Sequence, residues 1–70
     1  MISNENEFLG YLIKKSESIG YVYQLDAVNE GELSESETMH YAKSLIAKGY
    51  ITADITNYYV TEIGKKNYRP

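Results

Sequence analysis

Residues 45–51 read LIAKGYI and join the end of an amphipathic helix directly to the start of a strand. Gly49 can take the left-handed backbone conformation in which many helices end and which other residues resist. Tyr50 can then fold its ring back on the last helical turn. The stretch therefore predicts a helix that stops at Gly49 and a chain that continues at once into a hairpin.

Two segments after this stretch, 51–55 and 58–61, have the composition of strands. Thr56-Asn57 is suited to a two-residue reversal between them, because Asn tolerates a positive φ. Thr61 can cap a last helical turn in the sequence TEIGKK. The second half is thus predicted to be a helix, a two-stranded hairpin and a final turn.

The helix that ends at Gly49 has the clearest start signal in the chain. Ser34 and Glu37 fit a capping box, in which the hydroxyl accepts from the amide of Glu37 and the carboxylate accepts from the amide of Ser34. At about 100° per residue, the side expected to face inward comprises Thr38, Met39, Ala42, Leu45 and Ile46. The side expected to face outward comprises Ser36, Glu37, His40, Ser44 and Ala47, with Lys43 and Lys48 at its flanks.

The first third of the chain predicts a longer helix. Asn4 and Glu7 are suited to its start, since the Asn side chain can accept from a free amide and the acid lies near the positive helix end. Its expected inner face comprises Phe8, Leu9, Leu12 and Ile13. We expect the helix to fade over 16–18 and to break at Gly20.

The segment between these two helices is short. Residues 21–23, Tyr-Val-Tyr, have strand propensity over a very short length. A two-turn helix is expected over 24–30, with Leu25 and Val28 facing inward, a stop at Gly31 and an apolar anchor at Leu33.

Aromatic side chains are mostly tyrosine, with eight Tyr, one Phe and no Trp. Tyrosine rings are commonly half buried, with the hydroxyl in water or hydrogen-bonded. We expect Tyr11, Tyr50 and Tyr59 to lie in the core, and Tyr41 and Tyr58 to be exposed. An exposed aromatic patch on so small a domain would indicate a protein interface.

Length and composition limit the class of protein. Seventy residues allow one domain, 1–70, and the absence of cysteine excludes disulfides and thiolate metal sites. One histidine, no cysteine and no acid–histidine spacing leave no catalytic constellation, so we expect no enzyme, no metal and no cofactor. No apolar run approaches the roughly 20 residues of a membrane span, and no secretory signal is visible. We expect a cytoplasmic protein.

Charge is unevenly distributed along the chain. The net charge is −3, which argues mildly against nucleic acid. Residues 1–37 carry −6 and residues 38–70 carry +3. This asymmetry indicates either an interaction face or the ordinary solvated surface of helices.

The order of elements resembles the winged helix-turn-helix family, and the chain is most similar to the small YjcQ-like winged-helix proteins of Gram-positive bacteria and their phages. The resemblance implies a mainly helical α+β fold: three helices, a two-stranded wing and a short C-terminal turn. It also implies that the third helix, about 35–48, reads the major groove of double-stranded DNA. Carried onto this chain, the DNA-binding residues are Ser36, His40, Lys43, Ser44, Lys48, Lys65 and Lys66.

Two functions remain open at this point. The first is a small transcriptional regulator, acting as a dimer, in which Lys43 and Lys48 neutralise phosphates. Glu37 and the hairpin tip at 54–57, which has no Lys or Arg, depart from that pattern. The second is a protein-binding module, such as an accessory or anti-repressor protein of a phage or mobile element. His40 and the lysines could equally be surface residues without a specific role.

Overall fold

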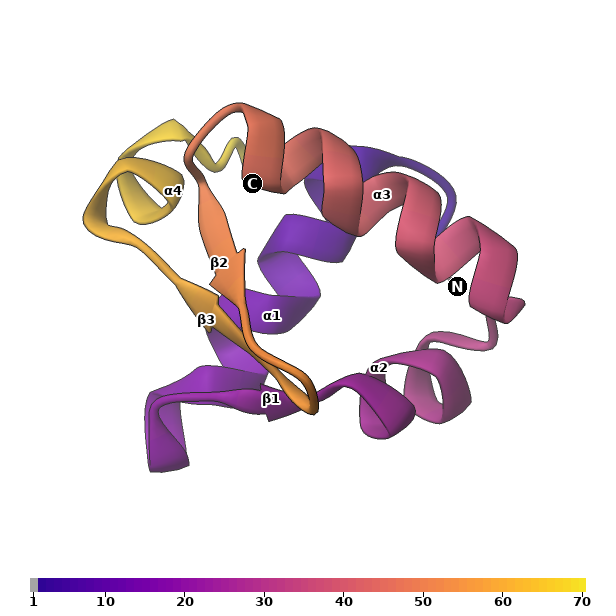
Figure 1. Ribbon diagram of the computed structural model, residues 1–70. Coiled ribbons are helices and arrows are strands. Elements are labelled where there is room, and N and C mark those ends of the chain that lie inside the picture. The colour runs from indigo at the N-terminus through magenta and orange to yellow at the C-terminus, as the bar shows by residue number, and fades with distance from the viewer. Residues whose placement is uncertain (1) are drawn as a thin grey trace.

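Four helices and a three-stranded antiparallel sheet make up the computed structural model, which describes residues 2–70 (Figure 1). In chain order the elements are α1 (Glu5–Ile19), β1 (Val22–Tyr23), α2 (Gln24–Gly31), α3 (Glu35–Ala47), β2 (Ile51–Ala53), β3 (Asn57–Val60) and α4 (Glu62–Asn67). The fold is therefore α+β and mainly helical, as predicted. No helix within the described residues has the length and apolar character needed to cross a membrane.

Helix α1 crosses behind the sheet and supplies the centre of the core (Figure 1). The Asn4 side chain accepts from the Glu7 amide at 2.9 Å, which confirms the predicted helix start. The helix does not fade over 16–18 but continues to Ile19, and Gly20 ends it at φ 84°.

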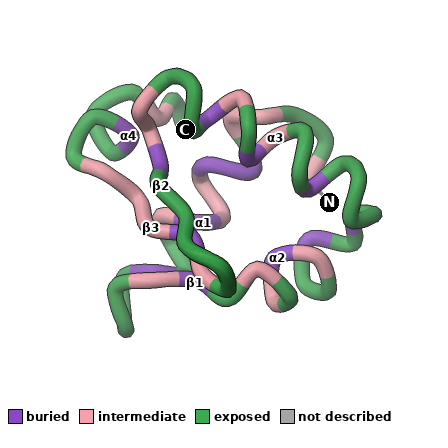
Figure 2. Tube along the Cα trace, viewed as in Figure 1, coloured by how far each residue is buried: buried purple, intermediate pink, exposed green. Residues whose placement is uncertain are grey.

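The core is built around the fully buried ring of Phe8. Its centroid lies 5.9 Å from that of Tyr41 on α3 and 6.1 Å from that of Tyr58 on β3. Figure 2 shows the buried positions meeting where α1, α3 and the sheet face one another. The other buried apolar residues are Leu9, Leu12, Val22, Ala27, Leu33, Ala42, Leu45 and Ile51.

The sheet has three strands in the order β1-β3-β2, one more than predicted. Val22 pairs with Tyr58, and Ile51 pairs with Val60. The two-residue strand β1 is stabilised by this pairing and by burial of Val22. Because both contacts come from distant parts of the chain, residues 21–23 alone give only a weak strand signal. The predicted exposure of the tyrosines on β3 was reversed, because Tyr58 is 4% exposed and packs on Phe8 while Tyr59 lies on the other face.

The turn between β2 and β3 differs from the expected Thr56-Asn57 reversal. β2 ends at Ala53, two residues earlier than predicted, and β3 begins at Asn57, one residue earlier. Asp54 directs the turn: its carboxylate accepts from the amides of Thr56 and Asn57 at 2.9 and 2.7 Å. This is an Asx-turn, in which a side chain replaces a backbone acceptor. The Tyr59 hydroxyl donates to the second carboxylate oxygen at 2.6 Å.

Helix α3 begins with the predicted capping box and its amides at Ser34 and Glu37 are paired as expected. Thr38, Ala42 and Leu45 are buried as predicted. Met39 and Ile46 were predicted to be buried, but they are 54% and 42% exposed. The helix is rotated about its axis because Tyr41, on the other side of the buried stripe, packs against Phe8.

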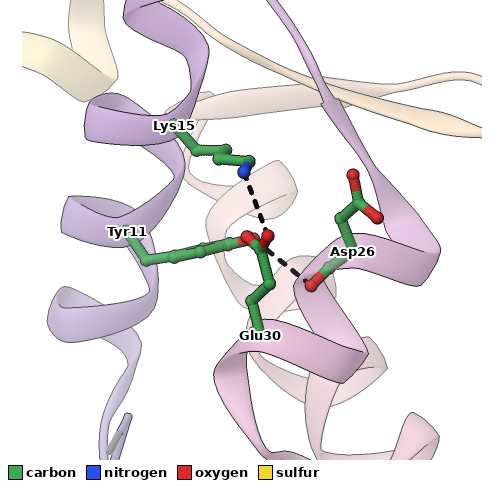
Figure 3. Close-up of polar contacts among 4 residues, drawn as sticks. All are labelled: Tyr11, Lys15, Asp26 and Glu30. Atoms are coloured by element: carbon green, nitrogen blue, oxygen red, sulfur yellow. Dashed lines mark hydrogen bonds and ion pairs between the residues drawn. The ribbon is translucent and has the colours of Figure 1, made fainter.

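Helix α2 buries Ala27 and leaves Leu25 71% exposed, so the prediction for Leu25 was wrong. A set of polar contacts turns the helix this way (Figure 3). The Tyr11 hydroxyl donates to Glu30 Oε1 at 2.7 Å, and Lys15 Nζ lies 3.0 Å from Glu30 Oε2. These contacts hold the side of α2 that carries Glu30 against α1.

Helix α4 packs against the connection between α3 and β2. The Thr61 hydroxyl caps it by accepting from the Gly64 amide at 3.1 Å, as predicted. A Cβ at Gly64 would lie 2.1 Å from the carbonyl oxygen of Tyr50, so only glycine allows this close approach. Helix α4 therefore lies at the end of the hairpin remote from the β2–β3 turn (Figure 1).

The capping box predicts a position-specific loss of stability. Ser34→Ala removes the acceptor for the Glu37 amide and should lower the free energy of unfolding by about 1 kcal/mol. In a domain of this size that corresponds to a fall in Tm of about 4–8 °C. The control is Ser36→Ala, at an exposed position on the same helix. Equal losses in the two variants, measured by thermal circular dichroism, would contradict the role of the cap.

The contacts between α1 and Glu30 of α2 predict that the stability of the fold falls at acidic pH. Hydrogen bonds from Tyr11 and then Lys15 hold the pKa of the Glu30 carboxyl below its usual range. Because the folded pKa is depressed, this stabilisation is present above the unfolded value of about 4.3 and is lost as the pH falls through the folded pKa. Measured by urea unfolding, the free energy of unfolding should fall less between neutral and acidic pH in Glu30→Gln than in wild type. Exposed Glu17→Gln is the control and should behave as wild type.

Candidate interaction site

The outer side of α3 presents three of the residues expected to contact DNA. Ser36, His40 and Lys43 are exposed and lie on the side of the helix away from the buried Thr38, Ala42 and Leu45. No acidic group among residues 2–70 lies within ion-pair distance of Lys43. Glu37, which was expected to face the DNA, instead turns back to the Ser34 amide. This side of α3 is polar and carries one unpaired cation.

Ser44 and Lys48 lie on a different side of α3, next to the start of α1. Lys48 Nζ forms an ion pair with the Glu5 carboxylate. This hydrogen bond, followed by one from Ser44, lowers the pKa of Glu5, and the same contact raises the pKa of Lys48. Both groups stay charged, and Glu5 offsets the charge that the half-exposed Lys48 would present to a phosphate.

Lys65 and Lys66 lie on α4, at the other end of the hairpin from the β2–β3 turn (Figure 1). Lys65 Nζ is 3.7 Å from Glu62 Oε1. The seven residues expected to bind DNA therefore fall into three separate groups. Lys48, Lys65 and Lys66 are exposed like the group on the outer side of α3, but Lys48 and Lys65 lie beside acids.

The β2–β3 turn carries an acid and an exposed apolar side chain. Hydrogen bonds from the Tyr59 hydroxyl and from the amides of Thr56 and Asn57 lower the pKa of Asp54, so this carboxylate is anionic at neutral pH. Ile55 next to it is 93% exposed. An anionic, apolar tip is unsuited to contact with phosphates.

A second surface, which the sequence did not identify, opens between α2, α3 and the β2–β3 turn. It is an open groove of about 680 Å³, and we call it the apolar groove. Its apolar lining comprises Tyr23, Leu25, Val28, Met39, Ile55 and the edge of Tyr58. Four of these side chains are about half exposed or more, although they are apolar. Exposed apolar side chains gathered in one place mark interaction sites, whereas scattered ones do not.

A tyrosine cluster continues this surface along the sheet. The rings of Tyr21 and Tyr23 meet edge to face with centroids 5.4 Å apart, and Tyr59 lies 6.4 Å from Tyr21. The hydroxyls of Tyr21 and Tyr23 share a hydrogen bond of 3.4 Å. Tyr23 belongs to both the cluster and the groove, so the two form one aromatic and apolar surface.

One signal in the sequence could have indicated the groove. Thr38, Ala42 and Leu45 already form the buried stripe of α3 that packs on the core. Met39 and Ile46 extend the apolar side of the helix beyond the width that one packing partner covers. For Leu25 and Ile55 no such signal exists, because their exposure depends on how α2 and the turn are placed.

No group of three or more His, Asp or Glu side chains within residues 2–70 is placed to hold a metal. Comparison of the chain with protein-family models, with curated proteins and with solved structures gives no match.

Proposed function

We propose that this chain is a small winged-helix-type domain that binds a protein partner through the apolar groove. Three helices followed by a hairpin support the winged-helix assignment, with α3 as the third helix and β2–β3 as the wing. The observation that carries the proposed function is the exposure of Leu25, Met39 and Ile55 around one groove. Full burial of one such side chain contributes about 1.5–3 kcal/mol, so a few suffice for a specific contact.

Charge on the same side of the molecule also favours a protein over DNA. Asp26 and Glu35 line the groove, and Asp54 adjoins Ile55 at the wing tip. Affinity for DNA comes mainly from cations that neutralise phosphates, and acids at the start of α3 and at the wing oppose it. The aromatic cluster beside the groove has the composition of protein interfaces, which are enriched in Tyr and Met.

The groove can be tested with matched substitutions on one helix. Met39→Glu places a charge in the groove, and Lys43→Glu changes an exposed residue on the outer side of α3. Met and Glu have similar helix propensity, so the fold should be retained in both variants. We expect Met39→Glu to weaken binding of the natural partner at least about tenfold, or about 1.4 kcal/mol, and Lys43→Glu to leave it unchanged.

The measurement is affinity purification of the tagged chain from its source cells, with the partner identified and its affinity then determined with purified components. A partner that binds Met39→Glu as tightly as wild type would place its site elsewhere and reject the groove.

Sequence-specific binding of double-stranded DNA, by a homodimer, is the second candidate. The specific observation in its favour is the outer side of α3, where Ser36, His40 and Lys43 are exposed and can reach base edges or phosphates. Lys48 would contribute if phosphate replaced Glu5, and Lys65 and Lys66 would contact the backbone from α4. In this arrangement α3 would enter the major groove.

DNA binding predicts a steep dependence on salt. In a titration of pooled duplex DNA at low salt, Lys43→Glu should weaken binding, and each lost phosphate contact should reduce the salt slope by about 0.9. Glu5→Gln should strengthen binding, because it releases Lys48. Lys14→Glu on α1 is the control for net charge. If wild type does not bind duplex DNA even at low salt, this candidate is rejected.

A further inference from the structure

We infer that the partner segment accepted by the apolar groove is a basic amphipathic helix, with apolar side chains on one face and Lys or Arg beside them. The inference rests on the proposed function and adds the chemistry of the partner. Its evidence is the charge at the rim of the groove, the pairing of the neighbouring backbone and the nature of the lining.

The groove is acidic on both of the helices that form it. Asp26 lies in the first turn of α2 and Glu35 in the first turn of α3, and both line the groove. Asp54 precedes Ile55 at the β2–β3 turn, but its carboxylate is bonded within the hairpin and is not part of the lining. No Lys, Arg or His is part of the lining. A partner with cations flanking its apolar face would complement Asp26 and Glu35, whereas an acidic partner would be repelled by them.

The backbone next to the groove favours a helix over an extended strand. Strand addition needs a run of free amides and carbonyls at a sheet edge. Here the Gln24 amide donates to the Thr56 carbonyl at 2.9 Å, and Gln24 Nε2 donates to the Asp54 carbonyl at 2.9 Å. The walls of the groove therefore offer side chains and not free backbone groups. A helix that inserts its residues i, i+3 or i+4, and i+7 is the form of peptide that binds between such walls.

The lining also favours a peptide over a small molecule. Small-molecule sites use a few converging polar groups to orient the ligand. No lining residue has a buried side-chain polar atom without a hydrogen-bond partner in the described chain. The charged groups of the groove lie instead at its rim, where a long partner can meet them at several points.

Three fluorescent peptides of equal length test this inference. The first is a helical peptide with Leu at i, i+4 and i+7 and Lys beside them; the second replaces each Lys with Glu; the third scrambles the first so that the apolar face is lost. By fluorescence anisotropy at low salt, we expect the Lys peptide to bind at least about tenfold more tightly than either of the others. The difference between the Lys and Glu peptides should shrink as salt is raised.

Variants of the protein assign the binding to the groove. Met39→Glu should weaken binding of the Lys peptide at least about tenfold, and Lys43→Glu should leave its affinity unchanged. Glu35→Lys should narrow or reverse the preference for the Lys peptide over the Glu peptide, and circular dichroism checks that it is folded. Equal binding of the Lys and Glu peptides by wild type would overturn the inference.

A selection from a random peptide library separates this inference from the proposed function. Some selected peptides should bind wild type but not Met39→Glu, and these depend on the groove. If such peptides are acidic or extended, the inference of a basic helical partner is overturned, while the proposed protein binding stands. If no selected peptide depends on Met39, both proposals are overturned. Self-association in wild type that disappears in Met39→Glu would assign the groove to a second copy of this chain and would also overturn the inference.

Discussion

Burial of the Phe8 ring between α1, α3 and β3 is the constraint on which the rest of the structure depends. The ring is fully buried and is met by Tyr41 from α3 and by Tyr58 from β3. Aromatic pairs of this kind contribute about 0.5–1.5 kcal/mol beyond the area they bury. Because Tyr41 is drawn toward Phe8, α3 is turned about its axis, and Met39 is carried away from the core toward α2 and the hairpin.

The same rotation separates two surfaces that the sequence had combined into one. The outer side of α3 keeps Lys43 exposed, while Lys48 is turned toward α1 and paired with Glu5. The side next to the hairpin becomes the wall of an apolar groove. Contacts of Glu30 with α1 hold the opposite wall, α2, in place. The walls of the groove are thus held by contacts within the chain itself, and preorganisation of this kind reduces the entropy that binding would cost under the proposed function.

Much of the secondary structure could be predicted because its signals are local. The capping box of Ser34 and Glu37, the helix stop at Gly49 and the cap at Thr61 each involve residues within a few positions of one another. Local hydrogen bonds and backbone preferences of this kind act in the same way whatever the rest of the chain does. The candidate site was predicted only in part: the outer side of α3 was identified, and the groove was not.

The sequence by itself determined that the chain is a small α+β domain, mainly helical, with its helices and hairpin in the observed order. Only the tertiary structure decided which side of each element is covered. Met39 and Leu25 look like core residues in their own helices, and Lys48 looks like an unpaired cation until Glu5, 43 positions away, is placed beside it. The physical reason is that rotation about a helix axis costs no local hydrogen bond. That rotation is therefore set by distant packing partners, which periodicity does not reveal.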